Sequence, residues 1–200
     1  MPRTMTDRAW LTPLLALLMV AGCVSATDHP EPLRSVAIAT GVAVTLPPTP
    51  ALGRTIEATQ LVTARYRDQT FVFEGHIAVT PERLLLVGLD TMGRRVLTVT
   101  WTAESVAIDA ASWLPDTLRP GNMLADIVMI YWPEAAVRAA LTGASLETRP
   151  DGGRTVRSAD GTEVVRIDYG TSAGAWSGRL QMKNLAWGYD LDIRSEETTP

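Results

Sequence analysis

The protein has 200 residues, with 18 Lys and Arg against 22 Asp and Glu, which gives a formal net charge of -4. An acidic chain without a basic patch lacks the electrostatic footprint of nucleic-acid binding, so we expect no nucleic-acid partner. Cys23 is the one cysteine, and the two histidines, His29 and His76, are far apart in sequence. This composition excludes an internal disulfide and favours neither a metal site nor a cofactor.

The N-terminus has the features of a bacterial lipoprotein signal peptide. Two arginines precede an apolar run over residues 10–20, and the small residues 21–22 lead directly to Cys23. This run is shorter than the roughly 20 apolar residues of a membrane span. We therefore expect residues 1–22 to be removed and Cys23 to carry a lipid. An uncleaved anchor and an ordinary signal peptide with a chance cysteine are the alternatives.

Residues 23–53 are expected to form a lipidated, proline-rich tether. Five prolines lie between residues 30 and 50, and proline interrupts regular ladders and stiffens an extended segment. The alanine- and valine-rich piece over residues 36–44 leaves two alternatives open, a short strand or a mobile apolar strap.

Residues 54–197 are expected to form the folded domain, in which short strands and tight turns predominate. Apolar and polar residues alternate with a period of two, as in half-buried antiparallel strands. Asp-Gly pairs at residues 151–152 and 160–161 are typical of hairpin turns. The expected strands cover residues 71–79, 84–89, 97–101, 106–108, 164–169, 180–182 and 189–193.

A helical segment interrupts these strands. Leu124, Ile127 and Tyr131 recur at helical spacing, and Pro133 ends this helix and can begin a second one. Gly143 is expected to cap the second helix. Strands, then helices, then more strands predict an α+β fold in which helices cover one face of an antiparallel sheet.

A curved sheet that is only partly covered by helices leaves a concave apolar face, which is the usual form of a lipid or small-molecule site. Each candidate residue could instead simply fill the core. The expected lining of this groove is Phe73, Leu84, Leu86, Leu97, Val99 and Trp101 from the sheet, with Leu124, Ile127, Tyr131 and Trp132 from the helical lid.

Sequence signatures of catalysis are weak, and we expect no enzymatic activity. The chain has neither a G-x-S-x-G serine motif nor a phosphate-binding glycine loop. His76 is expected on the strand face opposite Phe73, as a surface residue. Asp168 and Asp190 could form a carboxylate pair, but their alternation with apolar residues favours a solvated sheet face.

Several segments resemble the outer-membrane lipoprotein receptor LolB and its periplasmic carrier LolA, which are half-open antiparallel barrels with a helical lid. Residues 87–95 are similar to the receptor's strand–loop–strand, and residues 123–141 are similar to its lid. Residues 124–133 (LADIVMIYWP) and 160–169 (DGTEVVRIDY) more closely resemble an uncharacterised family of small bacterial lipoproteins. Members of that family are often encoded in aryl polyene pigment clusters, beside a LolA-like carrier and a lipid exporter.

The resemblance to the receptor implies a role for Met92. This residue matches the exposed apolar residue at the tip of the receptor's protruding loop, which takes part in delivering lipoproteins to the membrane. Met stands here in place of Leu, and Thr91 in place of Pro. A turn residue folded back on the sheet is the alternative.

Residues and resemblance together predict a monomeric outer-membrane lipoprotein on the periplasmic face, with a half-open antiparallel β-barrel and a helical lid inserted between strands. Val24 supports this location, because in enterobacterial lipoproteins Asp at that position retains the protein at the inner membrane. The predicted function is to bind an acyl chain, lipid or lipoprotein and help deliver it to the outer membrane, with a LolA-like carrier or an exporter as protein partner. Two alternatives are a non-enzymatic scaffold that docks onto an export machine, and a lipid hydrolase.

Overall fold

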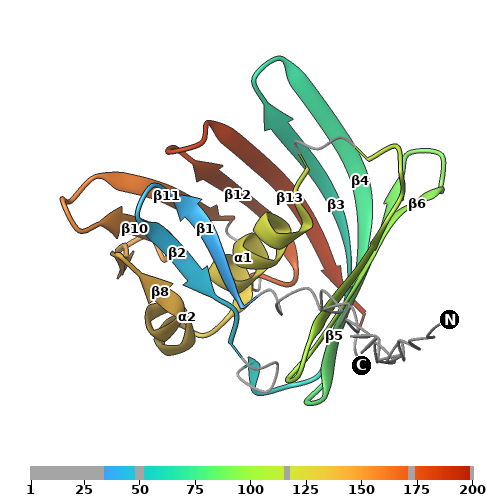
Figure 1. Cartoon of the computed structure of the whole chain (residues 1–200), viewed down its shortest axis with the longest axis horizontal. Helices are drawn as coiled ribbons and strands as arrows, with labels where there is room; N and C mark the ends of the chain where they lie inside the picture. Colours follow the sequence, from blue (N-terminus) through green and yellow to red (C-terminus); the bar gives the residue numbers. More distant parts are fainter. Residues whose placement is uncertain (1–33, 48–51, 115–117, 171–173, 199–200) are drawn as a thin grey trace, which may run out of the picture. The chain divides into compact units, whose positions relative to one another are not determined.

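The structure is a computed structural model, and it describes residues 34–47, 52–114, 118–170 and 174–198 (Figure 1). The expected signal peptide over residues 1–22 and the expected lipidation site Cys23 lie outside the described residues.

Ten strands form one antiparallel sheet in the order β7-β6-β5-β4-β3-β13-β12-β11-β10-β9. The two halves of the chain meet where β3 pairs with β13, with Val62 opposite Ile193. The strands are β3 Ile56–Tyr66, β4 Gln69–Val79, β5 Arg83–Asp90, β6 Arg95–Thr102, β7 Val106–Ala110, β9 Ala144–Thr148, β10 Arg154–Ser158, β11 Glu163–Tyr169, β12 Gly178–Asn184 and β13 Tyr189–Glu197.

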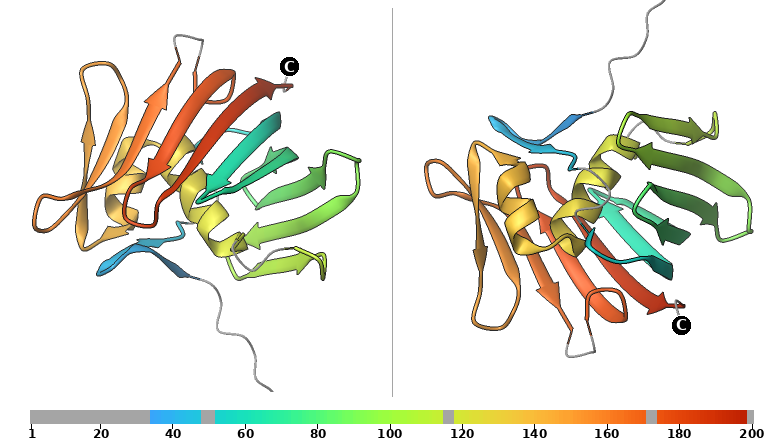
Figure 2. Two further views of the ribbon diagram at one scale, coloured as in Figure 1. Left: turned by 90° about the horizontal axis from the view of Figure 1, so that it is seen from above. Right: turned by 90° about the horizontal axis from the view of Figure 1, so that it is seen from below.

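The sheet curves around a helix, and its concave side is called the inner face below (Figure 2). Alternating residues of β3, from Ile56 to Val62, are buried on this face, as the period-two pattern requires. The terminal strands β7 and β9 do not pair with each other, so the barrel stays open. The predicted fold class, α+β with a half-open antiparallel barrel and a helical lid inserted between strands, is confirmed.

Helix α1 (Pro120–Tyr131) lies against the inner face, and the shorter helix α2 (Glu134–Ala140) follows it. All residues from Leu124 to Tyr131 are buried, because α1 is enclosed on more than one side. The sheet also satisfies carbonyls at the end of α1 that have no partner within the helix. Arg154 Nη1 donates to Met129 O at 2.7 Å, and Tyr169 Oη donates to Ile130 O at 2.6 Å.

A small second sheet corrects the expected tether. Strands β1 (Ser35–Ala39) and β2 (Val42–Thr45) form a hairpin, and β2 pairs with β8 (Leu141–Thr142). Ile38 and Val44 have no exposed surface, and Asn184 Nδ2 donates to Ile38 O at 2.9 Å. The strand alternative for residues 36–44 is therefore correct, and the boundary expected at residue 54 falls too late.

Gly143 lies in a corner between β8 and β9, and its expected role as a helix cap is wrong. Helix α2 ends at Ala140, and the backbone N–H of Leu141 closes its last turn on Val137 O. Gly143 has a φ of 74°, and a Cβ there would lie 2.0 Å from Gly41 O. Glycine is required at this corner by both its conformation and the close approach of the hairpin.

Within the described part of the chain, no helix combines the length and apolarity needed to cross a membrane.

Candidate functional site

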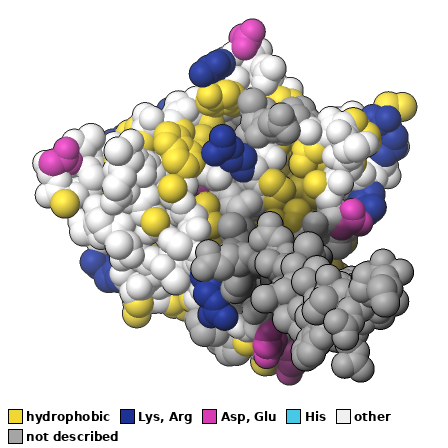
Figure 3. All heavy atoms as spheres, in the orientation of Figure 1, with side chains coloured by type: hydrophobic (Ala, Val, Ile, Leu, Met, Phe, Trp, Pro, Cys, Tyr) yellow, Lys and Arg dark blue, Asp and Glu magenta, His cyan; other side chains and the backbone are white. Residues whose placement is uncertain are grey.

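A cavity of about 60 Å³ lies between α1 and the inner face of the sheet. Figure 3 shows hydrophobic side chains reaching the surface on this side of the molecule. The lining is mainly apolar and comes from α1 and strands β3, β4, β5 and β13. Its residues are Gln60, Val62, Phe73, Gly75, Ile77, Leu86, Met123, Asp126, Ile127, Ile130, Tyr131, Leu191 and Ile193.

A glycine on the inner face, Gly75, leaves room for this cavity. Gly75 on β4 pairs with Gln60 on one side and with Gly88 on the other. A Cβ at Gly75 would lie 3.6 Å from Leu86 Cδ1 and 3.9 Å from Gln60 Cβ, which are ordinary van der Waals distances. The inner face therefore lacks a side chain at Gly75, whereas the side chain of Leu97 packs over Gly88.

A polar cluster lies at one side of the cavity. Gln60 Nε2 donates to Tyr131 Oη at 2.6 Å and to Ser195 Oγ at 3.0 Å, and the two hydroxyl oxygens are 3.3 Å apart. Gln60 is only 3% exposed. Burial raises the pKa of Tyr131 to about 12, so this hydroxyl remains uncharged at physiological pH.

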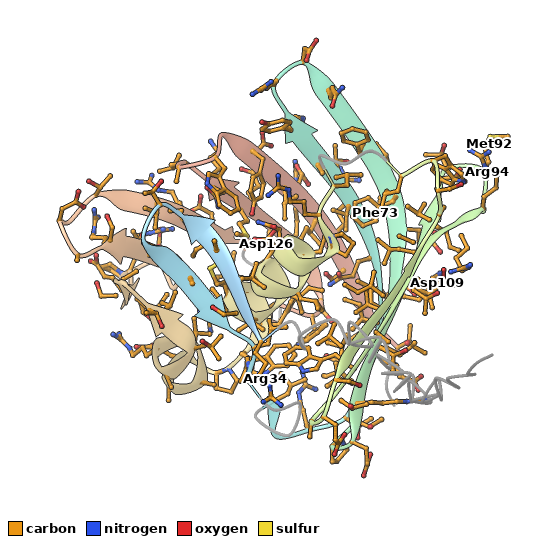
Figure 4. The ribbon with its side chains drawn as sticks, viewed as in Figure 1. Arg34, Phe73, Met92, Arg94, Asp109 and Asp126 are labelled. Carbon is orange, nitrogen blue, oxygen red and sulfur yellow. The ribbon has the colours of Figure 1, made fainter. Side chains whose placement is uncertain are left out.

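Asp126 is the carboxyl group of the lining. It is 5% exposed, and its Oδ1 accepts a hydrogen bond from Tyr189 Oη at 2.8 Å. Burial raises the pKa of Asp126 to about 8, and burial followed by the neighbouring carboxyl raises the pKa of Tyr189 well above its usual value. Both groups are therefore mainly neutral at pH 7. Figure 4 places Asp126 on α1 and Phe73 on the facing sheet.

Four of the ten expected groove residues line the cavity: Phe73, Leu86, Ile127 and Tyr131. Trp101 and Trp132 stack with ring centroids 5.6 Å apart and fill space elsewhere in the core. The residues placed in the core but outside the lining are Leu84, Leu97, Val99, Trp101, Leu124 and Trp132.

Sequence reasoning missed the contributions of β3 and β13, and it missed Asp126. Gln60 follows Ile56 and Ala58 at alternate positions of one strand, where a polar residue interrupts an apolar face. Asp126 likewise interrupts the apolar residues of α1. A polar residue within an apolar stripe is the sequence feature that could have indicated both.

Met92 protrudes from the turn between β5 and β6 (Figure 4) and is 77% exposed. Asp90 Oδ1 accepts hydrogen bonds from the backbone N–H groups of Met92 and Arg94, both at 2.9 Å, which fixes the turn. Trp113, 48% exposed, lies under the Arg94 guanidinium, 4.8 Å from ring centroid to Cζ. Met92 is therefore presented to solvent and is not folded back on the sheet.

The other candidate side chains do not assemble into a site. His76 is a surface residue whose Nε2 lies 2.7 Å from Glu74 Oε1. Asp168 pairs with Arg149, whereas Asp190 pairs with Arg65. Among residues 34–47, 52–114, 118–170 and 174–198, no group of three His, Cys, Asp or Glu side chains could hold a metal ion.

No curated protein matches the sequence. Among solved structures, the fold is similar to a LolA superfamily protein from Nitrosomonas europaea, with a TM-score of 0.43 and 8% sequence identity, covering 71% of this chain and 84% of that chain. It is also similar to a DUF1329 family protein from Desulfovibrio piger, with a TM-score of 0.39 and 7% identity, covering 74% and 87% of the two chains. The family model described as "Protein of unknown function (DUF3261)" matches residues 57–197, and the chain belongs to this family.

Proposed function

We propose that this protein binds the acyl chain of a lipid or lipoprotein between α1 and the inner face, and helps deliver it to the outer membrane. The observation that carries this proposal is the apolar cavity, which Gly75 leaves open at the centre of the sheet. The proposal includes anchoring by a lipid on Cys23 and a place on the periplasmic face of the outer membrane. Binding and release of a chain require no covalent chemistry, so the protein acts without being an enzyme.

The size of the cavity determines how a chain is held. A volume of about 60 Å³ is small beside the roughly 150 Å³ of a cavity that admits benzene. The closed site takes only a few carbon atoms, and a longer chain requires α1 to move from the sheet. Half-buried Met123 and Leu191 would extend the apolar path.

Partial burial also suits transfer. Each buried methylene contributes about 0.8 kcal/mol, so a few methylenes contribute on the order of 3 kcal/mol. A bilayer buries the whole chain and therefore binds it more strongly. Transfer of a cargo held in this way from protein to membrane would lower the free energy.

Binding is tested with the mature chain carrying Cys23→Ser, which cannot be acylated. We expect saturable binding of the methyl ester of a fluorescent fatty acid at one site per chain, with the blue-shifted emission of an apolar environment. Organic extracts of the purified protein, analysed by mass spectrometry, should contain lipid. Absence of both binding and co-purified lipid would refute the proposal.

The exposed turn predicts how the loaded protein contacts a membrane. Met92 offers an apolar side chain, while Trp113 and Arg94 are residue types suited to a membrane interface. Met92→Asp should slow transfer of a fluorescent fatty-acid methyl ester from protein to phospholipid vesicles by about thirtyfold, because an apolar contact worth roughly 2 kcal/mol is replaced by a charge. Affinity for the methyl ester should not change, since Met92 is outside the cavity lining.

Leu185→Asp is the matched control for this experiment. Leu185 is also an exposed apolar residue near a strand end, 51% exposed after β12. Its replacement should leave the transfer rate unchanged. Equal rates for the wild type and Met92→Asp would count against membrane contact by this turn and would favour docking of the turn onto a protein of the export machinery.

A further inference from the structure

We propose that Asp126, held by Tyr189, binds the carbonyl oxygen of an acyl ester or amide, so that the cavity selects its cargo by head group as well as by apolar chain. This inference rests on the proposed function and adds the chemical class of the ligand: an uncharged acyl derivative.

The buried carboxyl group of Asp126 has a hydrogen-bond partner, among the residues that the structure describes, on only one of its two oxygens. Asp126 is 5% exposed and lines the cavity, and Tyr189 Oη at 2.8 Å engages its Oδ1. Within the described residues this is the one hydrogen bond of the carboxyl group. Buried polar groups nearly always have at least one hydrogen-bond partner, which Tyr189 supplies here on Oδ1, while Oδ2 is not fully enclosed by the described residues. Oδ2 is therefore available to a ligand.

The second oxygen of Asp126, Oδ2, can donate a hydrogen bond to a ligand. Because burial raises the pKa of Asp126 to about 8, the group is mainly protonated at pH 7. Tyr189 donates to Oδ1, so the carboxyl proton belongs on Oδ2 and makes it a donor. A donor within an apolar cavity is complemented by a hydrogen-bond acceptor on the bound molecule.

The described lining of the cavity carries no positive charge that would favour a carboxylate or phosphate head group. None of the residues that line the cavity is Lys, Arg or His. A carboxylate or phosphate would lose its hydration there without gaining a cation. Among the described residues, Tyr189 on β13 donates to Asp126 and Tyr131 on α1 lines the same cavity, and both tyrosines have pKa values raised above the ordinary value. An uncharged carbonyl oxygen is the acceptor that fits.

Beyond the carbonyl group, the acyl chain of the ligand would lie along α1. Ile127 and Ile130 follow Asp126 along α1, and both line the cavity. The residue four positions after Asp126 lies one helical turn further on the same face. A carbonyl at Asp126 thus places the following methylenes against apolar side chains.

The test compares methyl decanoate with decyl methyl ether, which differ in one carbonyl group. Each displaces an uncharged probe, the methyl ester of a fluorescent fatty acid, from the mature Cys23→Ser chain. We expect the wild-type cavity to bind the ester about tenfold more tightly than the ether, as one hydrogen bond from a buried carboxyl would give. Asp126→Leu should reduce this ratio of affinities to about one, while the affinity for the ether is retained.

A second variant and a pH series keep the test independent of folding defects in Asp126→Leu. Asp126→Asn retains an acceptor for Tyr189 and a donor for the ligand, so it should keep most of the preference for the ester. In the wild type the preference should fall as the pH rises from 7 to 9, because ionised Asp126 repels a carbonyl oxygen. In Asp126→Asn it should not depend on pH.

Equal affinities for ester and ether in the wild type would overturn this inference and leave chain binding intact. A preference that survives Asp126→Leu would also overturn it. Tighter binding of decanoate or decylamine than of the ester would show that the site takes charged head groups instead. Failure of every chain to bind would refute the proposed function itself, so the two failures are distinguishable.

Discussion

Asp126→Asn is expected to stabilise the protein, and to do so increasingly as the pH rises from about 4 to 8. Burial raises the pKa of this carboxyl from 3.8 to about 8 in the folded protein. The folded state therefore holds the proton more tightly than the unfolded chain does. Stability is highest below pH 4, falls while only the unfolded chain ionises, and stops falling above pH 8, where both states are ionised.

The expected size of this effect follows from the same shift. Each pH unit between the two pKa values lowers the free energy of unfolding by about 1.4 kcal/mol, so the whole window amounts to on the order of 5 kcal/mol. The amide side chain of the Asp126→Asn variant would not ionise, yet its carbonyl oxygen would still accept the hydrogen bond of Tyr189. Wild type and Asp126→Asn should therefore have similar stability at pH 4 and differ by several kcal/mol at pH 8.

Urea denaturation at pH 4, 6 and 8 measures this difference. Asp90→Asn is the control of opposite sign, because the backbone N–H of Arg94 is the main contribution that lowers the pKa of Asp90. The stabilising effect of Asp90 is present above pH 4 and disappears as the pH falls through its lowered pKa. Asp90→Asn should therefore be destabilising at pH 8 and neutral in strong acid. If the free energy of unfolding varied with pH in the same way for wild type and Asp126→Asn, the assignment of a buried, protonated carboxyl would be contradicted.

A carboxyl that lowers stability at physiological pH is informative about the cavity. Asparagine has the same shape and would satisfy Tyr189 without ionising, so packing alone does not require Asp126. Proteins generally tolerate such destabilising groups where function needs them. Asparagine would also donate a hydrogen bond to the cargo, so the stability cost of Asp126 is separate from its proposed role as a donor.

The strands and helices were predictable to the extent that local periodicity encodes them. Period-two alternation predicted β4 to β6, and helical spacing predicted α1, because each pattern records which face of one element is buried. The pairing of β3 with β13 was not predictable in this way. It joins Val62 to Ile193 across most of the chain, and no local pattern specifies a partner that distant.

The same reason explains the mixed outcome for the groove residues. Alternation correctly placed Leu97, Val99 and Trp101 on the inner face, but it could not show that other core side chains would fill the space around them. The cavity forms where Gly75 on β4 lies beside Gln60 on β3, and both residues line it. That coincidence depends on register, which the sequence of one strand does not contain.

Gly75→Val is expected to weaken binding of a fatty-acid methyl ester by about thirtyfold. The new side chain would occupy the cavity with three carbon atoms and displace a similar number of ligand methylenes, a loss of about 2 kcal/mol. The backbone leaves room for the first carbon of the new side chain, since a Cβ at Gly75 meets its nearest neighbour, Leu86 Cδ1, at 3.6 Å. Valine also favours the extended backbone more than glycine does, so unfolding in urea should occur at an equal or higher concentration.

Ala78→Val on the same strand is the matched control, because residue 78 alternates with the buried residues Ile77 and Val79 and so faces away from the cavity. It should leave affinity unchanged, as measured by fluorescence titration. An unchanged affinity in Gly75→Val would place the chain elsewhere, since no ligand in this cavity could avoid the new side chain. Weaker binding in Gly75→Val with unaltered stability would locate the acyl chain over Gly75, in the cavity that Asp126 also lines.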